Sequence, residues 1–307
     1  MSLLESPMEL NQEPGPGIFL ICGEPAVGKT TFATSAPNPF ALDCDNSNKR
    51  IDVEHQVSTL PVRKYEDVLS LLDSRELDGF QTCIVDAFGM MVGMCHDYVK
   101  KKPKMSDPRK SWPETTSEMS SMFRSFKARG MHFVGLIHAT DNEVDGKRQI
   151  RPVSAGKPLN EISYLADIYG LMYLEDRKRY FEVFPHGMYQ FPAKGNKILG
   201  DRIEIPELVV GAKHDQFTRL IINPYLAFHR AKAAKSAVQL EAYTKLVESQ
   251  AQMIASVIDI DQMNVCYAEL KGMPEIGDSV SRYRQAIKEL LVERGWKLAA
   301  GGKFEVV

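Results

Sequence analysis

Short apolar runs alternate with stretches of mixed polarity through the first 174 residues of the chain. The apolar runs have few polar interruptions, and they lie at 18–22, 40–42, 83–85, 132–137 and 168–174. The stretches between them carry apolar residues at helical spacing, at 65–77, 88–99 and 113–129. Continuous apolar strands separated by amphipathic helices are typical of a parallel sheet that is covered on both faces. The pattern therefore predicts an α/β fold with a mostly parallel sheet flanked by helices.

The pattern changes after residue 174, where short segments are separated by Gly and Pro. These segments predict β-hairpins, and they lie at 179–184, 189–193 and 202–205. Two long amphipathic segments follow, at 231–258 and 280–294, and they predict a small C-terminal helical region. Residues 1–16 contain Pro14 and Pro16 and predict a flexible tail. We therefore expect three parts, with boundaries at 1–16, 17–227 and 228–307.

The composition is that of a globular protein without a strong electrostatic bias. The 307 residues include 38 Lys and Arg against 40 Asp and Glu, and 44% are hydrophobic. A formal net charge of -2 gives no general argument for nucleic-acid binding. No apolar run reaches the roughly 20 residues that a membrane span needs, so we expect no membrane association. The five cysteines form no C-x-x-C pair, which favours reduced thiols in a cytoplasmic protein.

The segment GEPAVGKT, from Gly23 to Thr30, fits the phosphate-binding pattern G-x4-G-K-[ST]. It follows a predicted strand and precedes a helix-compatible stretch, which is the context that this motif requires. In such a loop the backbone N–H groups surround phosphates, the lysine reaches the β- and γ-phosphates, and the hydroxyl group ligates Mg²⁺. The pattern therefore predicts ATP and Mg²⁺ as cofactors, with Lys29 as a catalytic residue. The predicted nucleotide-binding residues are Gly23, Glu24, Pro25, Ala26, Val27, Gly28, Lys29, Thr30 and Thr31.

The magnesium ion of such a site needs a second ligand besides the Thr30 hydroxyl group. The predicted strand TCIVD ends at Asp86, which places a carboxylate at the edge of the sheet beside the loop. Alone, this pattern is typical of a strand that ends in a capping acid. Together with the phosphate-binding loop it predicts Thr30 and Asp86 as metal ligands.

These motifs resemble those of the RecA-like P-loop ATPases. More closely, they are similar to phage-encoded AAA-family ATPases and short RecA-type single-strand-annealing recombination proteins. The resemblance covers about residues 17–226 and implies a RecA-like ATP-binding core. The segment YLADIYG, at 164–170, is similar to a segment of the phage group in particular.

The resemblance also implies roles for two residues at predicted strand ends. The segment FALDCD matches a strand that ends in Asp-x-Glu in the family, which puts Asp45 in the role of activating the attacking water. Aspartate is shorter than glutamate, and a capping Asp-x-Asp turn is the alternative interpretation. The segment FVGLIH puts His138 at the strand end that senses the γ-phosphate, although a lone histidine there is often structural.

The segment FPAKGNKILG, at 191–200, looks like the hairpin that carries lysine or arginine fingers in ring-forming RecA-like motors. There the cations reach the γ-phosphate of the neighbouring subunit and stabilise transition-state charge. The resemblance implies this catalytic role for Lys194 and Lys197. The K-x-R-x-G spacing of the family is not matched, so a solvated hairpin turn remains an equally good interpretation.

Two basic segments stand where RecA-like proteins carry their DNA-contacting loops. The segment 99–110 holds six cations and one acid, and the long predicted loop at 140–158 holds four cations and three acids. Such cations neutralise phosphates with little reading of base sequence, and Trp112 could stack on a base. A solvated face and a packed tryptophan are the alternatives. The predicted DNA-binding residues are Lys100, Lys101, Lys102, Lys104, Lys147, Arg148 and Arg151.

The sequence and the resemblance together favour an enzyme that hydrolyses ATP to ADP and phosphate when stimulated by single-stranded DNA. Its expected setting is phage recombination, repair or replication, in the cytoplasm of a bacterial host. ATP would bind between subunits of a homo-oligomeric ring or filament, and a single-strand binding protein is a further candidate partner. A small-molecule or nucleotide kinase and a non-hydrolysing nucleotide-dependent switch are the alternatives.

Overall fold

The computed structural model describes residues 14–102, 108–144, 147–153, 162–183, 193–207, 212–299 and 303–306, with side chains at 108 and 141–149 left out. Contacts divide the chain into two compact units, of which one spans Pro14–Phe228 and the other includes His229–Val307. Lys104 lies outside the described residues. The predicted loop at 140–158 and the predicted segment at 189–193 lie partly outside them.

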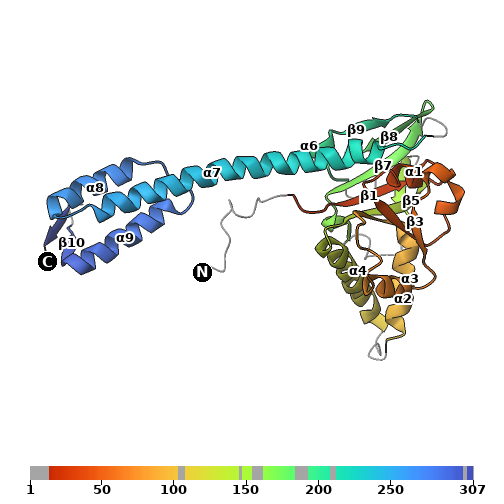
Figure 1. The fold of residues 1–307 in the computed structure, drawn as a ribbon, viewed down its shortest axis with the longest axis horizontal. Helices are drawn as coiled ribbons and strands as arrows, with labels where there is room; N and C mark the ends of the chain where they lie inside the picture. Colours follow the sequence, from red (N-terminus) through yellow and green to blue (C-terminus); the bar gives the residue numbers. More distant parts are fainter. Residues whose placement is uncertain are drawn as a thin grey trace. The chain divides into compact units, whose positions relative to one another are not determined.

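A twisted sheet forms the centre of the first unit (Figure 1). Its strands are β1 (Ile18–Gly23), β2 (Pro39–Asp43), β3 (Ser58–Pro61), β4 (Thr82–Asp86), β5 (His132–Val144), β6 (Lys147–Pro152), β7 (Ile168–Glu175), β8 (Lys178–Glu182) and β9 (Arg202–Ile205). The strand order is β3-β2-β4-β5-β1-β7-β8-β9, and β6 pairs with β5. The six neighbouring strands β3, β2, β4, β5, β1 and β7 are parallel to one another. The strand β8 pairs antiparallel with β7, β9 pairs antiparallel with β8, and β6 pairs antiparallel with β5.

Helices cover both faces of this sheet. They are α1 (Lys29–Ala33), α2 (Tyr65–Leu72), α3 (Phe88–Lys100), α4 (Ser111–Ala128), α6 (Asn196–Leu199) and the start of α7 (Asn223–Ala255). Alternate residues of β1 enter different cores: Leu20 packs with residues of α2, α3 and α4, and Ile21 packs with α1 and the π-helical turn Thr218–Ile222. The mostly parallel, helix-flanked sheet confirms the predicted fold class.

Two parts of the first unit differ from the sequence prediction. The strand β3 was not expected, because two of its four residues are polar and it lies at the edge of the sheet. The region from residue 140 was expected to be a loop, yet β5 continues to Val144 and pairs with β6 from Ala139↔Pro152 to Val144↔Lys147. This hairpin is polar along most of its length, so it lacks the apolar run that marks the buried strands.

The second unit contains three helices and a small hairpin in its described part. They are α7 beyond residue 228, α8 (Ile260–Gly272), α9 (Ser279–Arg294), β10 (Trp296–Leu298) and β11 (Phe304–Val306). The prediction of two helices was therefore incomplete, and α7 also begins earlier than expected, at Asn223. Met263, Leu270, Tyr283 and Ile287 form its core. No helix in the described part is long and apolar enough to cross a membrane.

Candidate functional site

The phosphate-binding loop connects β1 to α1 at the carboxyl edge of the sheet. Gly28 caps α1 with a φ of 95°, and Ala26 also has a positive φ, of 63°. At Gly23 a Cβ atom would lie 2.5 Å from the Met172 carbonyl oxygen of the neighbouring strand β7. The motif glycines at both ends of the loop are thus required, one by contact and one by its backbone conformation.

The lysine of the loop folds back over its own backbone. Its Nζ donates hydrogen bonds to the carbonyl oxygens of Gly23, at 2.9 Å, and Glu24, at 2.8 Å. The side chain is buried, and burial lowers the pKa of Lys29, which the nearby Asp86 carboxylate opposes. The ammonium group therefore lies across the mouth of the loop, where a phosphate would replace the carbonyl oxygens as its partner.

Thr30, at the start of α1, and Asp86, at the end of β4, lie in contact. The Thr30 hydroxyl group donates a 2.6 Å hydrogen bond to Asp86 Oδ2. Burial raises the pKa of the Asp86 carboxyl group, and hydrogen bonds from Thr30 and Ser47 oppose this rise. A hydroxyl and a carboxylate oxygen are ligands that suit Mg²⁺, so the two residues fit the metal role predicted for them.

A turn after β2 positions Asp45. The buried carboxylate of Asp43 accepts hydrogen bonds from the backbone N–H groups of Ser47, at 2.9 Å, and Asn48, at 3.3 Å. Asp45 Oδ1 accepts a further bond from the Ser47 N–H group at 3.0 Å. Asp43 is therefore a structural residue that fixes the turn, while Asp45 points to the sheet edge.

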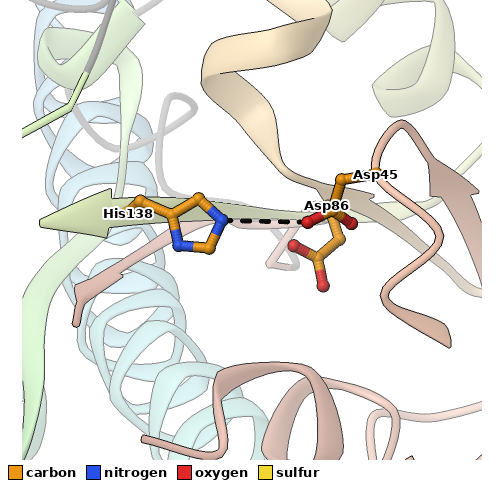
Figure 2. A group of neighbouring side chains, drawn as sticks. All are labelled: Asp45, Asp86 and His138. Atoms are coloured by element: carbon orange, nitrogen blue, oxygen red, sulfur yellow. Dashed lines mark ion pairs between the residues drawn. The ribbon is translucent and has the colours of Figure 1, made fainter. Parts of the chain in front are cut away.

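Asp45, Asp86 and His138 form a cluster at this edge (Figure 2). Each offers one ligand atom, and these atoms lie within 4.8 Å of one another. His138 Nε2 is 3.9 Å from Asp45 Oδ2, and Arg50 Nη1 lies 3.8 Å from the same oxygen. The turn after β2, the end of β4 and the middle of β5, widely separated in the sequence, thus bring two acids and an imidazole beside the loop.

His138 also stands where the strand β5 leaves the parallel sheet. It is the last β5 residue in register with β1, opposite Gly23, and Ala139 is the first residue paired with β6. Its carbonyl oxygen accepts a 2.6 Å hydrogen bond from the Val153 N–H group after β6. One residue therefore joins the acidic cluster to the β5–β6 hairpin.

The two predicted finger residues lie away from this cluster within the chain. Lys194 Nζ donates to the carbonyl oxygens of Tyr164, at 2.7 Å, and Ala166, at 3.4 Å, and it lies 5.9 Å from the centre of the Tyr164 ring. Lys197 is exposed on α6. Their action on a neighbouring subunit stays a prediction.

The predicted DNA-binding cations are in different situations. Lys100 lies 4.0 Å from Asp97, and Lys102 pairs with Glu118 and with Glu114, the latter at 3.3 Å. Lys101 is exposed. The three ion pairs of these two lysines reduce the net positive charge that this segment presents.

Other candidates for DNA contact lie on β6 and at the start of α4. Lys147 and Arg148 lie on β6 but their side chains are not described, whereas Arg151 is exposed on the same strand. Trp112 stacks on the His96 ring, with centroids 3.7 Å apart and planes at 12°. The tryptophan is thus packed against a residue of its own unit, and its stacking on a base stays a prediction.

Arg179 on β8 reaches the phosphate-binding loop, which the sequence prediction missed. Its Nε donates a 3.1 Å hydrogen bond to the Val27 carbonyl oxygen, and a Cβ atom at Gly28 would lie 3.1 Å from the same nitrogen. No local pattern marks this contact, because the two residues are 152 positions apart.

A family model described as "AAA domain" matches residues 17–197. This match covers more than half of the chain. The chain belongs to the AAA domain family. The match to the AAA domain includes the phosphate-binding loop, the cluster of Asp45, Asp86 and His138, and both Lys194 and Lys197. The AAA domain is a nucleotide-binding ATPase domain, and the helices after residue 197 lie outside the match. No curated protein matches the chain.

Proposed function

We propose that this AAA domain protein hydrolyses ATP with Mg²⁺ and that single-stranded DNA stimulates the reaction. The observation that carries the proposal is the meeting of Lys29 and Thr30 with the cluster of Asp45, Asp86 and His138. Phosphoryl transfer needs a phosphate cradle, a metal site and a group that orients the attacking water. These three requirements correspond to the loop, to the Thr30–Asp86 pair, and to Asp45.

The contacts support this assignment of roles. Mg²⁺ supplies charge neutralisation at the phosphates when it is bound, with Thr30 and Asp86 as its protein ligands. Asp45 is held by the Ser47 N–H group and lies 3.9 Å from His138, so it can orient a water at the γ-phosphate position. His138 then senses that phosphate, because its ring lies within the cluster.

The β5–β6 hairpin supports the DNA part of the proposal. It begins directly after His138, and it carries Lys147, Arg148 and Arg151. Binding of a phosphate backbone by these cations would bias the position of the strand that holds His138. A homo-oligomer of RecA-like type, in phage recombination, repair or replication, is the setting in which such coupling would be used.

The direct test is ATP turnover with and without single-stranded DNA at low salt. We expect DNA to raise the turnover, and Lys29→Ala to abolish it in both conditions. Lys127→Ala is the matched control, because Lys127 is exposed near the end of α4. A combined Lys147→Ala, Arg148→Ala and Arg151→Ala variant should keep basal turnover and lose stimulation.

Three results would contradict the proposal. DNA that leaves the turnover unchanged would remove the DNA part. Phosphoryl transfer to a metabolite would indicate a kinase, and nucleotide binding without hydrolysis would indicate a switch.

A further inference from the structure

The phosphate-binding loop has two different sides in the sheet. The strand order β4-β5-β1-β7-β8 places the strands that lead to Asp86 and His138 on one side of β1, and β7 and β8 on the other. Asp45 follows β2, on the same side as Asp86. The acidic cluster therefore borders only one side of the loop.

A shallow hollow borders the other side. Gly28 and Thr31 of the loop and α1 line it, together with Arg179, Pro206 and His214. Its volume is about 40 Å³, so it could hold one edge of a flat ring but could not enclose the ring. None of the described residues that line it is acidic.

Arg179 has the geometry of a stacking surface. Its guanidinium group lies close to Gly28. The Nε atom donates a hydrogen bond to the Val27 carbonyl oxygen, and a Cβ atom at Gly28 would lie 3.1 Å from this nitrogen. A planar guanidinium group stacks on aromatic rings, which a lysine ammonium group does not do. The glycine thus permits the approach of a flat cation to the loop.

His214 lines the same hollow, close to the backbone of Thr31. Burial lowers the pKa of His214, and the nearby His55 adds to this effect, which favours the neutral ring, although a hydrogen bond with the Thr31 backbone opposes the shift. The imidazole ring offers a flat face and the Pro206 ring an apolar one, which suit contact with a base rather than with a phosphate.

We infer that the nucleoside of the bound nucleotide lies in this hollow, with its base stacked on Arg179 and in contact with Pro206 and His214. The inference rests on the proposed function, in which the γ-phosphate lies at the acidic cluster. A triphosphate that extends along the loop from that cluster has its nucleoside end on the β7–β8 side. Arg179 is therefore a residue that binds the nucleoside and not the γ-phosphate.

The test compares ligands that have and lack a nucleoside. Isothermal titration calorimetry with MgATP, MgADP and magnesium tripolyphosphate is done on the full chain and on Arg179→Ala, Arg179→Lys and His214→Ala. Lys178→Ala is the matched control, since Lys178 is the adjacent strand residue and pairs with Glu204 instead. Circular dichroism melting establishes that each variant is folded.

We expect Arg179→Ala and Arg179→Lys to weaken MgATP and MgADP binding by about tenfold, because both remove the stacking plane. His214→Ala should weaken both nucleotides, and tripolyphosphate binding should stay within about twofold of wild type in all variants. Arg179→Lys with wild-type ATP affinity would overturn the inference, as would an equal loss for tripolyphosphate. A wild-type protein that binds neither nucleotide would instead overturn the proposed function.

Discussion

At the scale of single residues, the site depends on where Asp45 points. Its carboxylate lies between the Ser47 N–H group, the Arg50 guanidinium group and the His138 ring. An amide at this position keeps the shape and one acceptor oxygen but loses the negative charge that attracts the proton of a water. The role of Asp45 is thus separable from the binding of phosphates by Lys29.

We therefore predict that Asp45→Asn binds ATP within about threefold of wild type and loses turnover by about 10²-fold or more. Asp52→Asn is the control, because Asp52 is an exposed acid of the same segment. Calorimetry gives the affinity, and phosphate release gives the turnover. Turnover that survives in Asp45→Asn would remove Asp45 from the mechanism.

His132 gives a pH-dependent contribution to stability. Its Nδ1 accepts a 2.9 Å hydrogen bond from the Gly17 N–H group, and burial lowers its pKa, which the nearby Asp167 opposes. Protonation of Nδ1 would remove this acceptor. The unfolded chain therefore takes up the proton first, so the contribution is present above an ordinary pKa of about 6.5 and is lost as the pH falls below it.

We predict that the free energy of unfolding falls from pH 8 to pH 5 and that His132→Asn reduces the slope. The asparagine Oδ1 atom can accept the same hydrogen bond without titrating. Urea unfolding at several pH values measures both proteins, and the other histidines are common to both. Identical pH profiles would show that His132 does not contribute.

At the scale of secondary-structure elements, the junction of β7 and β8 is tightly packed. At Gly170 a Cβ atom would lie 2.5 Å from the Glu182 carbonyl oxygen and 2.7 Å from the Phe181 ring. The backbone oxygen has no freedom to move, because β8 pairs on its other edge with β9. By contrast, nothing lies within 4 Å of a Cβ atom at Gly93 in the helix α3.

We predict opposite effects for the two alanine substitutions. Gly170→Ala should destabilise the protein by about 1–3 kcal/mol through overpacking, and Gly93→Ala should stabilise it by about 0.5–1 kcal/mol through helix propensity. The midpoints of urea unfolding followed by circular dichroism measure both. Equal midpoints would contradict the packing at Gly170.

The elements that could be predicted from the sequence are those with a local signal. Buried strands such as β1 are continuous apolar runs, and the motif from Gly23 to Thr30 has a fixed spacing. The helix α8 was missed because its buried residues Met263 and Leu270 are interrupted by Val265, which is 61% exposed and blurs the apolar stripe. Arg179 was missed because its contact joins distant segments, and only the folded sheet brings these together.

At the scale of the whole molecule, the two units have separate hydrophobic cores. The core residues of the second unit lie between Ile254 and Phe304, whereas the buried residues of the two hydrophobic clusters on the sheet lie between Ile18 and Tyr225. The boundary between the units falls inside α7, after Phe228. The stability of the second unit should therefore be separable from nucleotide binding.

We predict that Leu270→Ala destabilises the second unit by about 2–5 kcal/mol, since Leu270 is 1% exposed, and leaves ATP affinity unchanged.

Each unit contains one of the two tryptophans, Trp112 and Trp296. Substituting one of them with phenylalanine makes the other a reporter of its own unit during urea unfolding. Leu270→Ala should lower the Trp296 midpoint alone, and Leu136→Ala, in the core beneath α1, should lower the Trp112 midpoint. A common shift of both reporters would show that the two cores unfold as one, because then the loss of a side chain in either core would be shared by the whole chain.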